Sequence, residues 1–256
     1  MTPLDIAHAA MAAAPEDAAL RLRFYDRVAD AELYVLLERE ATETVAPRIL
    51  ETDGASYVLA FDKPDRLTDF TGAISPYIGL SGRALAAMLR DQAIGIGLNL
   101  EVAPSAMLLP PEAVAWLAEA LGQAPGEEED HIAAIAPPSA LPEALLDALQ
   151  AKLATAGGFA REAYLATATY SAGARGTLLA FVDAGDGAER ALAGAVREAL
   201  VFSGIEAGAL DVAFVSSRDA ITAALGRHGF RLDLPKPREP KRIIPGSDPD
   251  RPPKLR

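Results

Sequence analysis

The sequence predicts an α+β protein of two domains, each a small mainly antiparallel or mixed sheet packed by helices. The chain has 256 residues, which suits two domains of ordinary size. Short apolar runs with strand character alternate with segments whose apolar residues recur at helical spacing. An acidic, Pro-containing stretch divides the chain near its middle, and a basic Pro-rich segment closes it. We therefore expect a first domain over residues 1–122, a linker over 123–138, a second domain over 139–235 and a flexible tail over 236–256.

The composition excludes several functional classes. The net charge of -12 disfavours nucleic acid as a partner, because phosphate binding needs a cationic surface. It equally disfavours unaided binding to anionic lipid. The chain has no Cys, which excludes disulfides, Cys-ligated zinc and thiol nucleophiles and fits a cytoplasmic protein. No run reaches 18 strongly apolar residues and the N-terminal segment lacks a basic leader, so we expect no membrane span and no signal peptide.

Helix and strand signals alternate through the predicted first domain. Thr2 and Pro3 are typical of a helix start, and Pro15 with the acids after it indicates a second one. Asp53-Gly54 favours a hairpin turn, Ser81 is expected to cap a helix, and Trp116 is expected in the core. Strands are expected over residues 33–37, 48–51, 56–61, 94–100 and 105–109, a helical turn over 66–70, and helices over 81–90 and 110–121.

The predicted second domain follows a helix-strand-strand-helix-strand-helix-strand order. Ser139 is expected to cap its first helix and Ser216 its last. Ile132 and Ile135, inside the linker, indicate either a short strand or a strap against one domain. The remaining elements are a helix over residues 139–156, a hairpin of strands over 163–170 and 177–182, a helix over 188–202, and strands over 210–215 and 229–234.

Several patterns approach a catalytic or binding motif without completing it. Gly95-Ile96-Gly97 lacks the third glycine and the following helix of a phosphate loop, so close packing explains these glycines better. The spacing around Ser81 does not fit a nucleophile elbow. The three histidines lie far apart and have no partner at helical spacing, which disfavours metal binding. We therefore expect no catalytic residue, no metal site and no cofactor.

Three features remain as candidates for binding. Asn99 is the only Asn, and its amide either satisfies backbone groups at a turn or faces a pocket. The acids Glu127, Glu128, Glu129 and Asp130 form either a solvated linker or a contact for a basic segment. The tail offers basic side chains for a partner, of which we single out Lys236, Arg238, Lys241 and Arg242.

A recognisable pattern begins at Phe24-Tyr25-Asp26-Arg27-Val28 and continues up to Val35. It is similar to the opening of the SseB family, the enhanced serine sensitivity proteins, and the resemblance covers the residues from Leu20 to Leu121. The run from Ser56 to Leu67 resembles its strand leading into a Phe-turn-Arg-Leu segment, and Gly95 to Asn99 resembles its glycine-strand-Asn element. The family usually continues with Pro-Gly, where this chain has Leu100-Glu101.

The second half of the chain resembles the C-terminal domain of the same family more loosely. The resemblance implies an α+β fold and brings no established catalytic residue.

These observations favour a non-enzymatic, cytoplasmic bacterial protein that binds another protein or itself. Two other classes stay open from the sequence. One is a small-ligand sensor that uses the first domain as receptor. The other is an enzyme with a Ser/Asp/Arg site between the domains.

Overall fold

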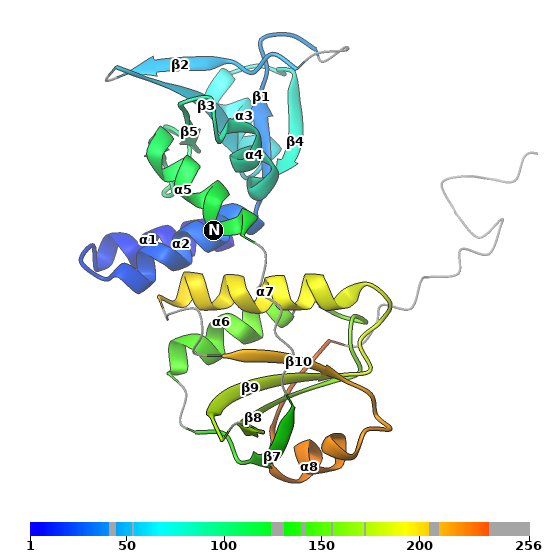
Figure 1. The fold of residues 1–256 in the computed structure, drawn as a ribbon. Coiled ribbons are helices and arrows are strands. Elements are labelled where there is room, and N and C mark those ends of the chain that lie inside the picture. Colours follow the sequence, from blue (N-terminus) through cyan, green and yellow to red (C-terminus); the bar gives the residue numbers. More distant parts are fainter. Residues whose placement is uncertain are drawn as a thin grey trace, which may run out of the picture. The chain divides into compact units, whose positions relative to one another are not determined.

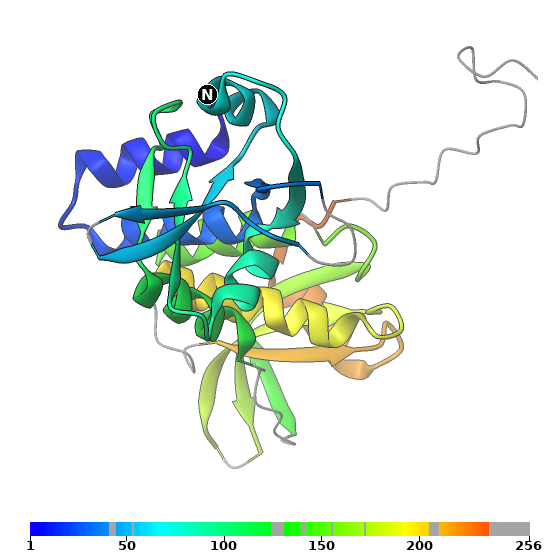
Figure 2. The same ribbon diagram turned by 90° about the horizontal axis from the view of Figure 1, so that it is seen from above.

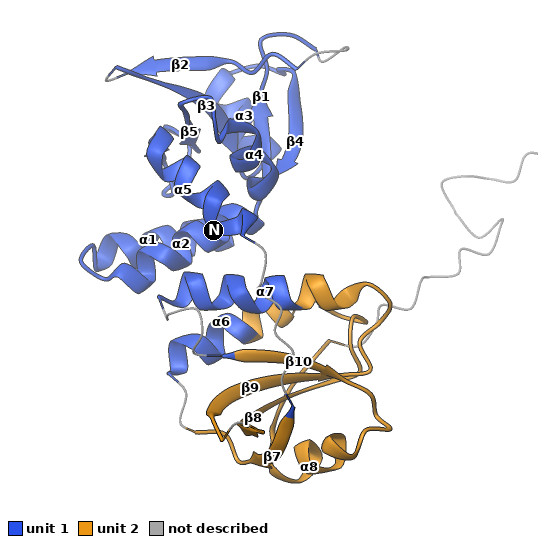
Figure 3. Cartoon of the chain, in the orientation of Figure 1, with its two compact units in different colours: residues 1–131, 140–149, 193–210 blue, residues 132–139, 150–192, 211–256 orange. Residues whose placement is uncertain are grey.

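The computed structural model describes residues 1–40, 45–52, 54–123, 131–139, 142–154, 156–171, 173–204 and 210–235. The chain divides into two compact units, which Figure 3 colours separately. The first comprises Met1–His131, Ala140–Leu149 and Ala193–Leu210, and the second comprises Ile132–Ser139, Gln150–Leu192 and the residues from Asp211 onward. Each unit contains a mixed sheet with helices, which confirms the predicted α+β class.

The first unit is built on a six-stranded sheet (Figure 1). Its strands are β1 (Glu32–Leu36), β2 (Ile49–Thr52), β3 (Ala55–Phe61), β4 (Tyr77–Ser81), β5 (Ile94–Leu98) and β6 (Met107–Leu109). Their order is β4-β1-β3-β5-β6, and β2 pairs with β3. The β3 and β5 strands are parallel, whereas the other pairs are antiparallel. The sequence did not predict β4, whose five residues alternate regularly between exposed and partly buried positions but contain only two aliphatic side chains.

Alternate strand residues face two separate apolar cores, as the pleat of a sheet requires. On one face, Leu33, Val58 and Ile96 pack with residues of five helices. On the other face, Leu36 and Phe61 pack with a single helix. The five helices are α1 (Pro3–Ala13), α2 (Ala18–Asp30), α4 (Gly82–Leu89), α5 (Pro111–Gly122) and α7 (Ala188–Ser203), which contributes Phe202, and the single helix is α3 (Pro64–Thr71).

The α1 and α2 helices lie side by side in both Figure 1 and Figure 2. Thr2 caps α1 as predicted: its side chain accepts a hydrogen bond from the Asp5 amide, and the Asp5 side chain accepts one from the Thr2 amide. The predicted start of α2 at Pro15 is wrong. Asp17 caps α2, since its carboxylate accepts from the amides of Ala19 and Leu20.

The prediction that Trp116 lies in the core is also wrong, because its side chain is 38% exposed. Val114 and Leu117 face the sheet, and Trp116 is turned about 100° away from Leu117 around the helix. Its ring contacts Tyr25 edge-on, with the ring centres 5.4 Å apart. The predicted packing role of Gly95 is confirmed, because a Cβ there would lie 2.4 Å from the carbonyl oxygen of Leu109.

The second unit carries a five-stranded sheet in the order β10-β9-β8-β11, with β7 paired to β8. Its strands are β7 (Ile132–Ala136), β8 (Glu162–Tyr170), β9 (Arg175–Val182), β10 (Asp211–Val215) and β11 (Phe230–Leu232). The predicted hairpin is β8 and β9, and β10 runs parallel to β9. Of the two alternatives for Ile132 and Ile135, the strand is the one found.

Helix α8 (Ala220–His228) buries Leu225 against one face of this sheet. The predicted caps at Ser216 and Ser139 are wrong. Asp219 precedes α8, and the Ser139 hydroxyl contacts Thr167 on β8 at 3.3 Å. Two helices, α6 (Glu143–Leu153) and α7 (Ala188–Ser203), pass from one unit into the other along the chain. None of the helices in the described ranges combines the length and apolar character needed to cross a bilayer.

Candidate functional site

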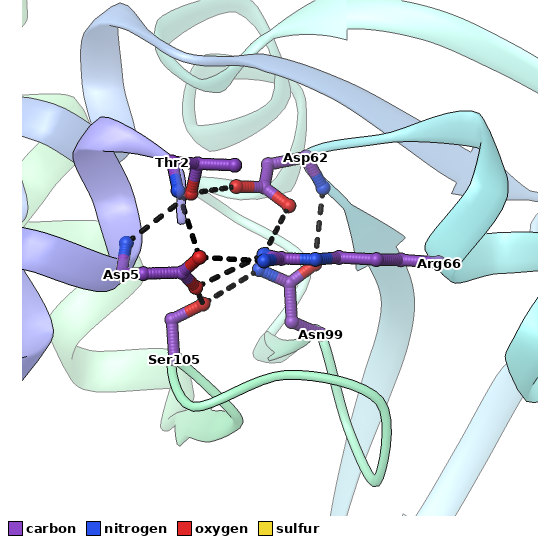
Figure 4. A network of polar contacts seen from close by, with 6 residues as sticks. All are labelled: Thr2, Asp5, Asp62, Arg66, Asn99 and Ser105. Atoms are coloured by element: carbon purple, nitrogen blue, oxygen red, sulfur yellow. Dashed lines mark hydrogen bonds and ion pairs between the residues drawn. The ribbon is translucent and has the colours of Figure 1, made fainter.

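Polar side chains gather where the two parallel strands of the first sheet end. Asp62 directly follows β3, and Asn99 directly follows β5. The carboxyl ends of parallel strands are where open α/β sheets place their ligand sites, so this edge of the sheet is the first place to look for one. Figure 4 shows the six residues that meet there. We call them the polar cluster: Thr2, Asp5, Asp62, Arg66, Asn99 and Ser105.

Asn99 extends the pairing of the two parallel strands by one residue. Its backbone amide donates to the carbonyl of Ala60 at 2.9 Å, and its side-chain Oδ1 accepts from the Asp62 amide at 3.0 Å. Its φ of 47° lies in the left-handed region, which Asn adopts more readily than most residues. The Nδ2 group donates to Ser105 Oγ at 2.9 Å. Asn99 is therefore fully buried with both ends of its amide bonded.

Asp5 brings a carboxylate from α1 into this edge of the sheet. Arg66 approaches it with both terminal nitrogens: Nη1 donates to Oδ1 at 3.0 Å and Nη2 to Oδ2 at 2.5 Å. Ser105 Oγ also donates to Oδ1, at 2.7 Å. The two-pronged arrangement is the strong geometry of an arginine–carboxylate pair, and it links residues 61 positions apart in the sequence.

Asp62 joins the cluster by sharing Nη1 of Arg66 with Asp5. Its Oδ1 accepts from Arg66 Nη1 at 2.7 Å, an i,i+4 pair that forms at the start of α3. Its Oδ2 accepts from the Thr2 hydroxyl at 2.6 Å. One guanidinium thus lies between two carboxylates and supplies the positive charge that a cation would otherwise bring.

The electrostatics of the cluster favour its ionised form. Burial by itself raises the pKa of the Asp5 carboxyl, but the hydrogen bonds from Arg66, Ser105 and the Thr2 amide outweigh burial. Together they hold the pKa of Asp5 well below its usual range. The same contact raises the pKa of the Arg66 guanidinium, which is cationic at neutral pH.

The depressed pKa of Asp5 predicts a stability that is lost in acid. At neutral pH, Asp5 is ionised in both the folded and the unfolded chain, so its full stabilisation is present. As the pH falls through about 4, the unfolded chain takes up the proton first, and the free energy of unfolding decreases by up to about 1.4 kcal/mol per pH unit for this group. Urea unfolding between pH 5 and 2.5 should show a shallower decrease for Asp5→Asn than for the wild type. Parallel decreases in the two proteins would contradict this assignment.

The contacts within the cluster do not activate its serine. A hydroxyl that donates to a carboxylate resembles a nucleophile with its base. Here the carboxylate is a weak base because its pKa is depressed, and Ser105 has no exposed surface through which a substrate could approach. In this conformation Arg66 and Ser105 bind the carboxylate of Asp5, which belongs to the same chain.

A second group of carboxylates lies in the first unit. Oxygens of Asp26, Asp30 and Glu198 lie within 4.8 Å of one another. Arg83 Nη2 donates to Asp30 at 2.7 Å, and its Nη1 donates to Glu198 at 2.9 Å. The bond to Glu198 raises the pKa of Arg83, so this arginine provides the compensating charge that a metal ion would provide.

The structure places one of the sequence-predicted candidates in the cluster, namely Asn99. The predicted contact residues Glu127 to Asp130, and Lys236, Arg238, Lys241 and Arg242, lie outside the described residues. The Ser/Asp/Arg combination considered from the sequence does occur, inside the first unit. Two local patterns signal its parts: Thr2 followed three residues later by Asp5, and Asp62 followed four later by Arg66. Nothing in the sequence indicates that these two pairs meet.

Residues 7–116 match the family model of the SseB protein N-terminal domain. Over these residues the chain is similar to that domain. The predicted resemblance between residues 20 and 121 is thereby confirmed, whereas the looser resemblance of the second half stays a prediction. No curated protein and no solved structure matches the chain. The matched residues include four members of the polar cluster, whereas Thr2 and Asp5 precede them.

Proposed function

We propose that this SseB-domain protein is a cytoplasmic binding protein that docks an extended segment of a partner protein and catalyses no reaction. The polar cluster supports the second part, because its serine is buried and its carboxylate is paired. The proposed docking of a partner segment rests on one observation: the outer side of β4 pairs with no strand of the described residues.

The backbone of β4 has hydrogen-bonding groups that point away from the sheet. Leu37 donates its amide proton to the Pro76 carbonyl, and Gly82 donates to the Ala31 carbonyl, both at 2.9 Å. In an antiparallel ladder the bonded direction alternates, so the backbone groups of Tyr77 and Gly79 face outward. Among the described residues no strand pairs with this side of β4.

The side chains along β4 favour a peptide partner. Edge strands are usually protected by lysine, proline or a bulge, and the five residues Tyr77–Ser81 contain neither of these residue types and no charge. Tyr77 is 48% exposed and contacts the Tyr34 ring edge-on, while Ile74 just before the strand is 98% exposed. Strand addition uses such an edge: the backbone gives affinity and neighbouring apolar side chains give specificity. The occupant we propose is an extended, apolar segment of another protein.

A lysine at the open edge tests this proposal. Tyr77→Lys introduces a charge and removes an aromatic anchor, which we expect to weaken partner binding by about 30-fold, in line with the loss of one aromatic hot spot. The measurement is quantitative affinity capture from the source organism, followed by titration of the captured proteins. Ala87→Lys is the matched control, since it adds the same charge on the exposed side of α4. Equal binding by the wild type and both variants would contradict docking at β4.

A further inference from the structure

The polar cluster has two sides that come from different parts of the chain. Asp62, Arg66, Asn99 and Ser105 belong to the sheet, α3 and the loop after β5, and we call these four residues the cradle (Figure 4). Thr2 and Asp5 belong to α1 and fill the cradle. The cradle residues lie within the matched SseB domain, whereas the residues that fill it lie before residue 7.

The cradle binds the Thr2 hydroxyl and the Asp5 carboxylate, which are three residues apart in the sequence. The carboxylate of Asp5 accepts three hydrogen bonds from it, two from Arg66 and one from Ser105, at 2.5–3.0 Å. The Thr2 hydroxyl donates to Asp62 at 2.6 Å. Asn99 positions both Asp62 and Ser105, because its Oδ1 accepts from the Asp62 backbone amide and its Nδ2 donates to the Ser105 hydroxyl. The pattern that fits the cradle is therefore a Ser or Thr with an acid three positions later, presented at the start of a helix.

Beyond these contacts, a small set of side chains fixes α1 to the first unit. Leu4 and Ala7 are its buried apolar residues, Met11 packs partly against the core, and the His8 ring contacts Phe24 edge-on with ring centres 5.6 Å apart. Ile6 is exposed on the opposite side of the helix. The first turn of α1 is therefore held by the burial of Leu4 and by the pairing of Asp5 with Arg66.

We propose that the cradle is a binding site for an acidic peptide segment with the pattern Ser/Thr-x-x-Asp, and that α1 occupies this site in cis. A partner segment with the same pattern competes with α1, so binding of the partner releases the N-terminal helix. This site is separate from the β4 edge, and its test does not depend on a partner at that edge.

Exchange of α1 for a labelled peptide tests the proposal. A specific protease site is inserted between Ala14 and Pro15, the folded chain is cut, and a fluorescent peptide of residues 1–14 is titrated in. We expect saturable binding that falls at least 30-fold for the Asp5→Asn peptide and falls for Thr2→Ala. The Ile6→Ala peptide is the matched control and should bind as the wild type does. Equal binding of the Asp5→Asn peptide, or no binding to the cut and folded chain, would overturn the proposal.

A second arm uses the uncut full chain. Asp5→Ala leaves a gap of the size of a carboxylate, so 100 mM formate should raise its melting temperature by about 2–4 °C relative to 100 mM chloride. Formate should give no rise in Asp5→Ala/Arg66→Ala. Inorganic phosphate at the same concentration distinguishes a carboxylate site from a general anion site: a rise equal to that with formate would overturn the assignment to carboxylate. The absence of a rise with formate would overturn the cradle itself.

Discussion

Replacing Arg66 with alanine is expected to lower the free energy of unfolding by about 3–5 kcal/mol, the cost of leaving a buried charge without its partner. The guanidinium lies between the carboxylates of Asp5 and Asp62, and both carboxylates are almost completely buried. Without it, Asp5 keeps only the hydrogen bonds from Ser105 and the Thr2 amide. The measurement is urea unfolding at pH 7 followed by circular dichroism.

Arg90→Ala is the matched control for this substitution. Arg90 ends α4 on the exposed surface, where removal of a side chain usually changes stability by less than about 0.5 kcal/mol. A loss for Arg66→Ala as small as the loss for Arg90→Ala would show that the cluster contributes nothing to holding the fold.

Gly82→Ala is expected to destabilise the first unit by about 3 kcal/mol or more, because overpacking a close backbone contact forces the elements apart. A Cβ at position 82 would lie 1.8 Å from the carbonyl oxygen of Val28 and 3.2 Å from the Cα of Ala29. Both contacts are with the backbone of α2, which no side-chain rotation relieves. The start of α4 would have to move away from α2, where Val28 and Ala29 are fully buried.

Gly79→Ala is the matched control, three residues earlier in the chain. A Cβ there would meet only Glu32 Oε1, at an ordinary distance of 3.6 Å. Thermal unfolding of both variants should therefore show a large loss for Gly82→Ala and a small change for Gly79→Ala. Equal melting temperatures would contradict the close contact between α2 and α4.

Most elements of the fold could be predicted from local patterns. The strand predicted over residues 94–100, found as Ile94–Leu98, and the helix caps at Thr2 and Ser81 all depend on neighbouring residues, and these predictions are confirmed. The errors have local causes as well. Pro15 and Asp17 both signal a helix start, and only the Asp17 carboxylate reaches the free amides. The residue type of Trp116 predicts a position in the core, whereas the rotation of α5 decides its exposure.

The polar cluster could not be predicted in the same way. The Asn99 amide was recognised as unusual, but its partners come from positions 62 and 105. Asp5 and Arg66 are separated by 61 residues, and each also fits an ordinary local role, one in a helix cap and one at an i,i+4 pair. The parallel pairing of β3 with β5 brings Asp62 and Asn99 to one edge of the sheet, and the packing of α1 brings Asp5 there. The open side of β4 depends on strand order, which the sequence leaves undetermined.

The account rests on the claim that Asp5 binds the cradle through Arg66, and a double-mutant cycle measures that coupling directly. The free energies of unfolding of the wild type, Asp5→Ala, Arg66→Ala and the double variant are obtained under one set of conditions. We predict a coupling energy of about 2–3 kcal/mol, with the double variant losing little more than the more damaging single variant. Additive losses, with a coupling energy near zero, would show that the two residues act independently and would contradict the account.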